Sequence, residues 1–588
     1  MRIATINYDR CHPKKCNHEC QHYCPIQRDN VPVIEFNSEG WPNISETLCV
    51  GCGICIHKCP FKAINIINLA EEYQEEVVHQ YGENKFRLFR LPIPQKGIVV
   101  GILGMNGMGK STVLEILSGK LIPNFGNFDK KPSLEDAMDH YAGTMLHEHF
   151  KTLANGSLSI SYKQQYVNKI IEKFNGTVED YISSSDSSTN RVYEIFPIER
   201  IRNYKLETLS GGELQLLEIA KVLAKDSDFY IIDEPSSYLD IFQRLKVIDA
   251  IRAIAENKHV IVVEHDLAIF DALADVAHIM FGVPTSYGIV GKSQTSRHAI
   301  NNFLYGFIKE ENVRIRDFPI KFEPHAPNKE WKGEVYLTFD KLVKKYDNFK
   351  LTVNGGTIKK GEVVGIVGQN STGKTTFVKI LASVEQPTEG KMEMAIKVSY
   401  KPQYIKGDMD TIVNDMIQTI SMNDFQRHIY ESDIVPMLNL DSLLHSPVSS
   451  LSGGELQTVA IALTLLRNAD VYLLDEPSAY LDANQRMEAA KLIRRVIEKR
   501  GASGFVVEHD VYFLDLVSDS VMVFAGTPGK EGIANGPYPL KKGMSIFLNS
   551  IDISFRRDED SKRPRINKKN SVMDREQKEK GELYFVIQ

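Results

Sequence analysis

The feature that most constrains the fold is a long internal repeat. LSGGELQLLEIAKVLAKDSDFYIIDEPSSYLD at 209–240 returns in closely similar form 242 residues later, at 451–482. GILGMNGMGKST at 101–112 returns as GIVGQNSTGKTT at 365–376, and VVEHD occurs at both 262–266 and 506–510. A repeat this long indicates two copies of a whole domain. Each copy alternates buried strands with helices, which predicts α/β domains with mostly parallel sheets.

Each copy contains a glycine-rich loop between an apolar strand and an amphipathic helix. Backbone N–H groups of such a loop can hold phosphates, while its lysine reaches the β/γ oxygens and its hydroxyl binds Mg²⁺. The predicted ATP-binding residues are Gly104, Asn106, Gly107, Gly109, Lys110, Ser111 and Thr112 in the first copy, and Gly368, Asn370, Gly373, Lys374, Thr375 and Thr376 in the second.

Two carboxylates end a buried strand in each copy, FYIIDE and VYLLDE. Asp233 and Asp475 suit the magnesium shell together with Ser111 and Thr375. Glu234 and Glu476 suit orienting or deprotonating the attacking water. The loop and this acidic pair together predict nucleotide hydrolysis in both copies.

All eight cysteines lie before residue 60. The second group has the spacing C-x2-C-x2-C-x3-C-P of bacterial ferredoxins, and the first repeats it with a wider first gap. In two-cluster proteins the fourth cysteine of each group binds the other cluster. We therefore expect two [4Fe–4S] clusters, one held by Cys11, Cys16, Cys20 and Cys59, and the other by Cys24, Cys49, Cys52 and Cys55. The alternative is a pair of zinc sites that also use His12, His18, His22 or His57.

Composition adds few constraints. The net charge of −6 neither favours nor excludes nucleic acid, because a local basic patch can lie within a near-neutral total. No apolar run approaches the roughly 18 residues of a membrane span, and the N-terminus lacks the apolar stretch of a secretory signal. A cytoplasmic protein is expected, in which thiols stay reduced and clustered cysteines bind metal.

LSGGE, the D-E-P-S-x-Y-L-D run and the following histidine resemble the ATP-binding-cassette (ABC) nucleotide domain. Two such cassettes fused to two ferredoxin-type cysteine groups, with SRHAINNFLYGFIKEENVRIRDF between them and RPRINKKNSVMDREQKEKGELYF at the end, resemble one family. It is the ribosome-recycling ATPase family, ABC subfamily E, also called the RNase L inhibitor family.

The resemblance implies five regions. They are an α+β ferredoxin-like iron–sulfur domain at 1–70, a first cassette at 71–282, a first hinge part at 283–330, a second cassette at 331–525, and a second hinge part with the C-terminal tail at 526–588. The first cassette has 26 more residues than the second between its loop and its Q-loop glutamine. The family places a ribosome-binding helix-loop-helix in this surplus, near 133–155, whereas without the resemblance a tolerated surface insertion is the alternative.

The resemblance also implies two composite sites from cassettes that face each other head to tail. Site one combines the first loop with Gln165, Asp233, Glu234 and His265 and with the signature residues Ser452, Gly453 and Gly454. Site two combines the second loop with Gln403, Asp475, Glu476 and His509 and with Ser210, Gly211 and Gly212. Asp240 and Asp482 would make contacts across the interface, and adenine would stack on Tyr81 and Phe86 in site one and on Phe349 in site two.

The expected function is ATP-driven splitting of ribosomes after termination or rescue, by a monomer that binds the small subunit and its RNA. A release or rescue factor is an expected partner, and initiation factors are further candidates. The resemblance also implies that the hinge touches RNA phosphates, through Arg297, Arg314, Arg316 and the five basic residues of 561–573, including Arg563 and Arg565. A solvated charged tail is the alternative for 561–573. The alternatives are the ATPase half of a membrane transporter and an ATP-gated electron-transfer enzyme. A DNA-repair ATPase is disfavoured, because no long heptad insertion separates the motifs.

Overall fold

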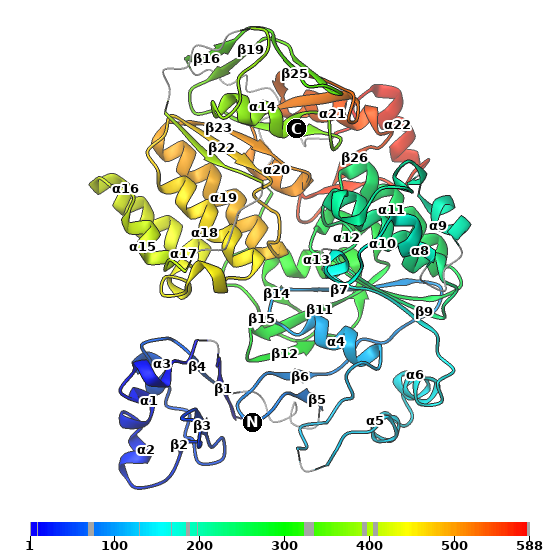
Figure 1. Cartoon of the computed structure of the whole chain (residues 1–588). Coiled ribbons are helices and arrows are strands. Elements are labelled where there is room, and N and C mark those ends of the chain that lie inside the picture. Colours follow the sequence, from blue (N-terminus) through cyan, green and yellow to red (C-terminus); the bar gives the residue numbers. More distant parts are fainter. Residues whose placement is uncertain are drawn as a thin grey trace.

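The computed structural model describes residues 2–8, 10–68, 76–128, 130–165, 167, 169–183, 189–196, 198–322, 334–390, 397–403 and 410–584. The predicted boundaries at 70/71 and 330/331 lie outside these residues. The chain forms a small N-terminal domain and two large α/β lobes, which Figure 1 shows from blue to red.

The first cassette is built on a nine-stranded sheet. Its strands, in spatial order, are β5 (Val77–Gln80), β6 (Arg87–Phe89), β12 (Tyr287–Val290), β11 (Val276–Val283), β7 (Val99–Gly104), β10 (His259–Val263), β9 (Phe229–Asp233) and β8 (Ile160–Lys163), with β13 (Gln294–Thr295) beside β11. From β11 to β8 the strands are parallel. Strands β7 and β9 are buried along their whole length, as their continuous Val, Ile and Leu runs predict for a parallel sheet covered on both faces.

The helices of the first cassette connect these strands. They are α4 (Lys110–Leu117), α7 (Lys169–Lys173), α8 (Val178–Ser183), α9 (Thr189–Ile195), α10 (Gly211–Ala224), α11 (Ile241–Ala255) and α12 (Leu267–Leu273). The glycine-rich loop and Asp233 both follow the carboxyl ends of parallel strands, β7 and β9, where ligands of open α/β sheets bind.

The surplus segment of the first cassette folds into two helices, α5 (Leu134–His140) and α6 (Met145–Ala154). They are fixed to the rest of the cassette, because the side chain of Phe150 is fully buried and stacks on Tyr141. The ring of His149 also lies 2.9 Å from the carbonyl oxygen of Leu117, at the end of α4. The insertion is therefore attached directly to the helix that follows the phosphate loop.

The second cassette repeats the same order in an eight-stranded sheet. Its strands are β17 (Leu342–Lys345), β18 (Lys350–Val353), β25 (Glu531–Pro539), β24 (Ser520–Thr527), β20 (Val363–Gly368), β23 (Ser503–Val507), β22 (Val471–Asp475) and β21 (Val398–Lys401), and β16 (Val335–Phe339) pairs separately with β19 (Gly356–Lys359). Its helices are α14 (Lys374–Leu381), α15 (Val413–Gln418), α16 (Asp424–Ile429), α17 (Val435–Leu438), α18 (Gly453–Leu466), α19 (Ala483–Arg500), α20 (Val511–Val517) and α21 (Leu540–Ser550).

The N-terminal domain consists of two antiparallel strand pairs and three short helices. The pairs are β1 (Arg2–Ile6) with β4 (Ile64–Asn68) and β2 (Ile34–Phe36) with β3 (Pro42–Ile44), and the helices are α1 (Glu19–His22), α2 (Pro25–Arg28) and α3 (Ile54–Lys58). The domain lies against the first cassette: Thr5 donates to Ser286 (2.7 Å), and Asn84 donates to the carbonyl oxygens of Ala4 and Ile44.

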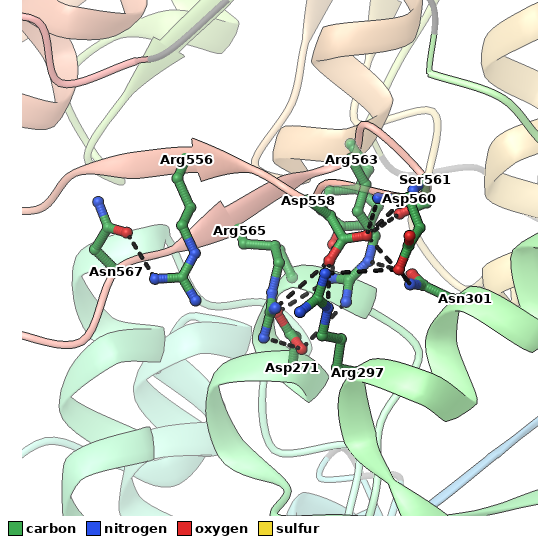
Figure 2. A network of polar contacts seen from close by, with 12 residues as sticks. Asp271, Arg297, Asn301, Arg556, Asp558, Asp560, Ser561, Arg563, Arg565 and Asn567 are labelled. Atoms are coloured by element: carbon green, nitrogen blue, oxygen red, sulfur yellow. Dashed lines mark hydrogen bonds and ion pairs between the residues drawn. The ribbon is translucent and has the colours of Figure 1, made fainter. Parts of the chain in front are cut away.

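Two separate segments join the cassettes. The first contains α13 (Ser296–Tyr305), β14 (Phe307–Ile308) and β15 (Val313–Arg314). The second contains β26 (Phe555–Arg557), β27 (Pro564–Ile566) and α22 (Val572–Lys580). Figure 2 shows the polar network in which they meet, where Asp558 binds Arg297, Asn301 and Arg565.

This network corrects part of the RNA prediction, because Arg563 is fully buried. Its guanidinium donates to Asp271 of α12, to Tyr512 of α20 and to Asn301 of α13. Arg565 forms ion pairs with Asp271 and Asp558, and Arg316 donates to the carbonyl oxygens of Phe303 and Leu304 and to Asn484. The prediction that Arg563 touches RNA is therefore wrong, since carboxylates, a phenol and an amide inside the protein already hold its charge and donors. Most of the hydrogen-bond donors of Arg565 and Arg316 are likewise used by partners inside the protein.

No helix among the described residues is both long enough and apolar enough to cross a membrane.

Candidate functional site: two nucleotide sites and a cysteine-lined cavity

The first phosphate loop is held in shape by its own backbone and by Lys110. Gly109 ends it with φ +89°, a backbone conformation that favours glycine, and a Cβ there would lie 2.6 Å from the ring of Phe86. Lys110 is buried at the start of α4, and its ammonium donates to the carbonyl oxygens of Gly104 (2.9 Å) and Met105 (2.8 Å). Burial lowers the pKa of Lys110, although Asp482, Glu234 and Asp233 oppose the shift.

The end of β9 brings the predicted hydrolytic groups of site one together. Gln165 Nε2 donates to Glu234 Oε1 at 2.5 Å, and His265 Nε2 lies 3.3 Å from the same oxygen. The predicted Gln165 is thus the glutamine that contacts Glu234. Burial and the charge of Glu234 raise the pKa of Asp233 to about 7. Burial also acts to raise the pKa of Glu234, but His265, Lys163 and Lys110 outweigh it and hold this pKa at about 2.

The two cassettes contact each other through their phosphate loops. The backbone N–H of Asn106 donates to Asp482 Oδ2 (2.9 Å), and the N–H of Asn370 donates to Asp240 Oδ2 (2.8 Å). Each aspartate also caps a helix of its own cassette, where its other oxygen accepts an N–H. These reciprocal contacts give a head-to-tail arrangement of the kind expected from the sequence.

A cleft at site one contains residues from both cassettes. The first loop, Gln165, Asp233, Glu234 and His265 line it together with Ser452, Gly453 and Gly454 of the second cassette. In both copies the signature serine caps the next helix in a capping box, Ser210 with Glu213 and Ser452 with Glu455. A Cβ at Gly454 would lie 2.8 Å from the carbonyl oxygen of Tyr480, so the close approach needs glycine.

Site two has the same parts with slightly different geometry. Lys374 donates to the carbonyl oxygens of Gly368 (2.9 Å) and Gln369 (2.8 Å), and His509 Nε2 lies 3.8 Å from Glu476 Oε1. Burial, reinforced by the charge of Asp475, raises the pKa of Glu476. The glutamates of the two sites therefore sit in different electrostatic surroundings.

The magnesium prediction can be tested against the surroundings of Asp475. Its side chain is fully buried, and its carboxylate has little compensation there: the Thr375 hydroxyl interacts with it, but no hydrogen bond of good geometry is made by either oxygen among the described residues. A buried carboxylate with so little compensation is costly, and oxygen ligands beside a phosphate site are what Mg²⁺ prefers. Asp475, with the Thr375 hydroxyl at the start of α14, is a donor set that fits this ion.

The aromatic residues lie close to the phosphate loops. Tyr81 and Phe86 line the cleft of site one, and the Tyr81 hydroxyl lies 3.1 Å from Thr112 Oγ1. The ring of Phe349 faces Gly373 in site two. The sequence analysis missed Tyr346, which interacts with Thr376 as Tyr81 does with Thr112 and also donates to Glu385. Aligning the two copies from their loops backwards would have found it.

Sequence reasoning also missed a contribution from the N-terminal domain. Asn7, Arg10, Lys62 and Asn65 line the cleft of site one. Nothing in the sequence indicates that this domain reaches a cassette, because the contact depends on how two separately folded units pack.

The eight cysteines lie in two groups within the N-terminal domain. Cys24, Cys49, Cys52 and Cys55 line one apolar cavity together with Val33, Ile34 and Ile44. The second group is indicated by the electrostatic interactions of Cys11 with three other cysteines. Burial, together with repulsion from Cys59, Cys20 and Cys16, raises the pKa of Cys11 to about 12. Each group therefore contains three cysteines of one sequence motif and one of the other.

Three family models match these regions. The ABC transporter model matches residues 93–237 and 352–479. A model described as a possible Fer4-like domain in RNase L inhibitor matches residues 1–32, and the 4Fe-4S binding domain model matches residues 42–65.

Relatives match along the whole chain. An uncharacterized ABC transporter ATP-binding protein of Methanocaldococcus jannaschii is 49% identical over 100% of this chain and 98% of its own length. Translation initiation factor RLI1 of Saccharomyces cerevisiae is 40% identical over 100% of this chain and 98% of its own. The structure of ribosome-bound archaeal Pelota and ABCE1 matches with a TM-score of 0.95 at 47% identity, over 100% of this chain and 99% of the other. The complex of archaeal stalk protein aP1 with the archaeal ribosome recycling factor aABCE1 matches with a TM-score of 0.82 at 47% identity, over 87% and 99%.

The chain belongs to ABC subfamily E, the family of ribosome-recycling ATPases.

Membership of subfamily E decides between iron–sulfur clusters and zinc for the cysteines, in favour of the 4Fe–4S binding domain. The geometry fits such a group. No three His, Cys, Asp or Glu side chains among the described residues converge closely enough to hold one metal ion. A four-iron cluster does not require this, because each cysteine binds a different iron.

Proposed function

We propose that this subfamily E protein splits ribosomes into subunits after termination or rescue, by closing two ATP sites between its cassettes. The observation that carries the proposal is the pair of reciprocal hydrogen bonds from Asn106 to Asp482 and from Asn370 to Asp240. Because each phosphate loop contacts the opposite cassette, a nucleotide bound to one loop can draw the two cassettes together.

Within each site, the chain's own groups bind the phosphates and position water. Lys110 and Lys374 would exchange their loop carbonyl partners for β/γ oxygens, and the small signature residues would approach the γ-phosphate from the other cassette. Ser111 with Asp233, and Thr375 with Asp475, would hold Mg²⁺, which neutralises developing phosphate charge when bound.

Glu234 and Glu476 would orient or deprotonate the attacking water. Gln165 and Gln403 hold their carboxylates by hydrogen bonds, and His265 and His509 lie beside them. Adenine would stack on Tyr81 and Phe86 in site one, and on Phe349 with Tyr346 in site two. Site one differs because Arg10 and Lys62 of the N-terminal domain line its cleft.

The N-terminal domain would hold two [4Fe–4S] clusters, one on Cys24, Cys49, Cys52 and Cys55 and the other on Cys11, Cys16, Cys20 and Cys59. It is attached to the first cassette through Ser286 and Asn84, and Arg87 forms an ion pair with Glu46 at 2.6 Å. Movement of that cassette would therefore carry the domain against a ribosomal subunit or a bound factor.

The proposed partners are the small ribosomal subunit, a rescue factor of the Pelota type and a stalk protein. One similar structure is of ribosome-bound Pelota and ABCE1, and another contains a ribosomal stalk protein. The contacts proposed for RNA phosphates move to exposed groups. These are Arg314 and the exposed lysines Lys562 and Lys568. The helices α5 and α6, whose charged side chains are mostly acidic, stay proposed as a ribosome contact that does not depend on RNA phosphates.

The decisive experiment combines co-sedimentation with a light-scattering assay of ribosome splitting. A non-hydrolysable ATP analogue should keep the protein on small subunits, and higher salt should weaken this binding, because Lys/Arg contacts to phosphate release counterions. Reversing Lys562 and Lys568 to Glu should reduce the binding without changing thermal stability. A wild-type protein that ignores ribosomes in the closed state, yet stimulates a permease or reduces an electron acceptor, would overturn the proposal in favour of the transporter or the redox function.

A further inference from the structure

Two buried lysines have no part in the mechanism proposed above. Lys163 ends β8 and Lys401 ends β21, each two residues before the Q-loop glutamine, and their exposed fractions are 0% and 1%. Lysine is almost never fully buried unless it is paired. The same residue in the same place in both cassettes needs a reason.

In the first cassette, the ammonium of Lys163 reaches the backbone of the acidic pair. It donates to the carbonyl oxygens of Asp233 at 2.7 Å and Glu234 at 3.1 Å. Gln215 of the signature helix α10 donates to the same Glu234 oxygen at 2.8 Å. Lys163 of strand β8 and Gln215 of helix α10 thus both donate to the backbone carbonyl oxygen of the glutamate proposed for hydrolysis.

The second cassette repeats this arrangement. Lys401 donates to the carbonyl oxygens of Asp475 (2.8 Å) and Glu476 (3.4 Å), and Gln457 of α18 donates to Glu476 at 2.8 Å. The same hydrogen bonds are thus made in both copies, around the same type of acidic pair.

The backbone conformation of the glutamate that these hydrogen bonds hold is unfavourable in both cassettes. Glu234 has φ +48° and Glu476 has φ +46°, in the left-handed region that non-glycine residues rarely adopt. The N–H of each glutamate donates to the neighbouring strand, to Val263 at 2.8 Å and to Val507 at 3.0 Å. Lysine, glutamine and strand together fix the peptides on both sides of the residue and hence the direction of its side chain.

The positive charge of these lysines also suits their position beside the acidic pair. Lys163 and the loop lysine Lys110 both attract the carboxylates of Asp233 and Glu234. Lys110 lies on the loop that takes the phosphates, whereas Lys163 is held by the sheet, where its residue pairs with Ile232 of β9. Once Lys110 turns to a nucleotide, Lys163 still faces the acidic pair.

We propose that Lys163 and Lys401 are positioning residues for hydrolysis, each fixing the peptide of the water-orienting glutamate and balancing the acidic pair from the sheet side. The inference rests on the proposed hydrolysis at both composite sites. It predicts that removal of the ammonium slows the chemical step while nucleotide binding at the phosphate loop persists.

The test isolates one site at a time. Glu476→Gln leaves site one to hydrolyse ATP, and Lys163→Met is added in this background; Glu234→Gln leaves site two, and Lys401→Met is added there. Lys163→Gln and Lys401→Gln keep an N–H donor without the charge. Lys397→Met, at an exposed lysine just before β21, is the matched control. Single-turnover hydrolysis gives the chemical rate, and fluorescent ATP titration gives the dissociation constant.

The Met variants should lose about 10- to 100-fold in single-turnover rate, as expected for a misplaced reacting group, while their ATP dissociation constant stays within about threefold. The Gln variants should recover part of the rate, and Lys397→Met should behave as its parent. A Met variant that hydrolyses at the parent rate, or that loses binding and hydrolysis in parallel, would overturn the proposal. If a Met variant is insoluble, the Gln variant decides: it should keep the ATP dissociation constant within about threefold and lose part of the single-turnover rate, and a Gln variant at the full parent rate would overturn the proposal. The two parent Glu→Gln proteins test the two-site function independently of either lysine.

Discussion

At the scale of single residues, the two proposed ATP sites are built from the same residue types and yet are not equivalent. His265 lies closer to Glu234 than His509 does to Glu476, at 3.3 Å against 3.8 Å. The pKa of Glu234 is lowered and that of Glu476 is raised. The two glutamates should therefore contribute unequally to turnover.

Replacing either glutamate with glutamine keeps shape and hydrogen bonding but removes the carboxylate that handles the water proton. We expect hydrolysis at the altered site to fall by about 10²- to 10⁴-fold, the usual contribution of a general base. ATP should still bind and hold that site closed. Single-turnover measurements on Glu234→Gln, Glu476→Gln and the double variant check this, and wild-type turnover in the double variant would remove both glutamates from the mechanism.

The cysteine assignment gives a second prediction at this scale. Anaerobically purified protein should be brown and contain about eight iron atoms per chain. Cys24→Ser should damage the cluster whose cavity Cys24 shares with Cys49, Cys52 and Cys55, and Cys59→Ser should damage the other. Iron analysis and electron paramagnetic resonance distinguish the two. Loss of the same cluster in both variants would contradict the crossed ligand sets.

The sequence predicted the site residues whose arrangement depends on neighbouring positions in the chain, and it failed where the partners are far apart in the chain. The cysteine spacing and the phosphate loops are set by a few neighbouring residues, and the structure brings them together as the motifs indicate. Arg563 was misread because a basic run looks the same whether it faces water or a buried carboxylate. Its partners, Asp271 and Tyr512, lie 292 and 51 residues away. Tyr346 was missed because its loop is shorter than the one that carries Tyr81.

At the scale of elements, the insertion is part of the first cassette rather than an appendage. Phe150 and Leu146 of α6 are buried in the same apolar core as Leu117 of α4. The family resemblance implied the two helices, but the sequence did not indicate that they pack on the helix of the phosphate loop. Deleting 133–155 would therefore uncover this core as well as remove a ribosome contact.

Point substitutions separate the two effects. Met145→Asp changes a side chain that is 62% exposed, so we expect weaker binding to small subunits with stability within about 0.5 kcal/mol of wild type. Phe150→Ala should instead cost about 3–5 kcal/mol in the free energy of unfolding through a core cavity. Co-sedimentation and urea denaturation measure the two quantities. Unchanged ribosome binding by Met145→Asp would remove this face of α6 from the contact.

At the scale of the whole molecule, the cassettes are held together by an apolar core and by the polar network of Figure 2. In this network, Arg563 contacts both cassettes and the first hinge segment. Arg563→Ala would leave the buried carboxylate of Asp271 with less compensation, and losing one partner of a buried ion pair costs about 3–5 kcal/mol.

We therefore expect Arg563→Ala to lower the melting temperature and to impair closure, with the phosphate loops themselves unchanged. Lys562→Ala, at the exposed neighbouring position, is the matched control and should melt as wild type does. Calorimetry with and without a non-hydrolysable ATP analogue checks this. Wild-type melting combined with lost ribosome binding would restore the RNA role that burial argues against.

The long sequence separation between Arg563 and Asp271 has a consequence for biosynthesis. Asp271 is translated 292 residues before the arginine that pairs with it. At about 5–20 residues per second, this interval lasts roughly 15–60 s. During this interval, the first cassette can complete its own sheet. The carboxylate of Asp271 must stay hydrated until Arg563 is made, and the interface between the two cassettes cannot form completely. A protein proposed to take ribosomes apart thus reaches its finished form only after a long stretch of its own translation has followed the first cassette.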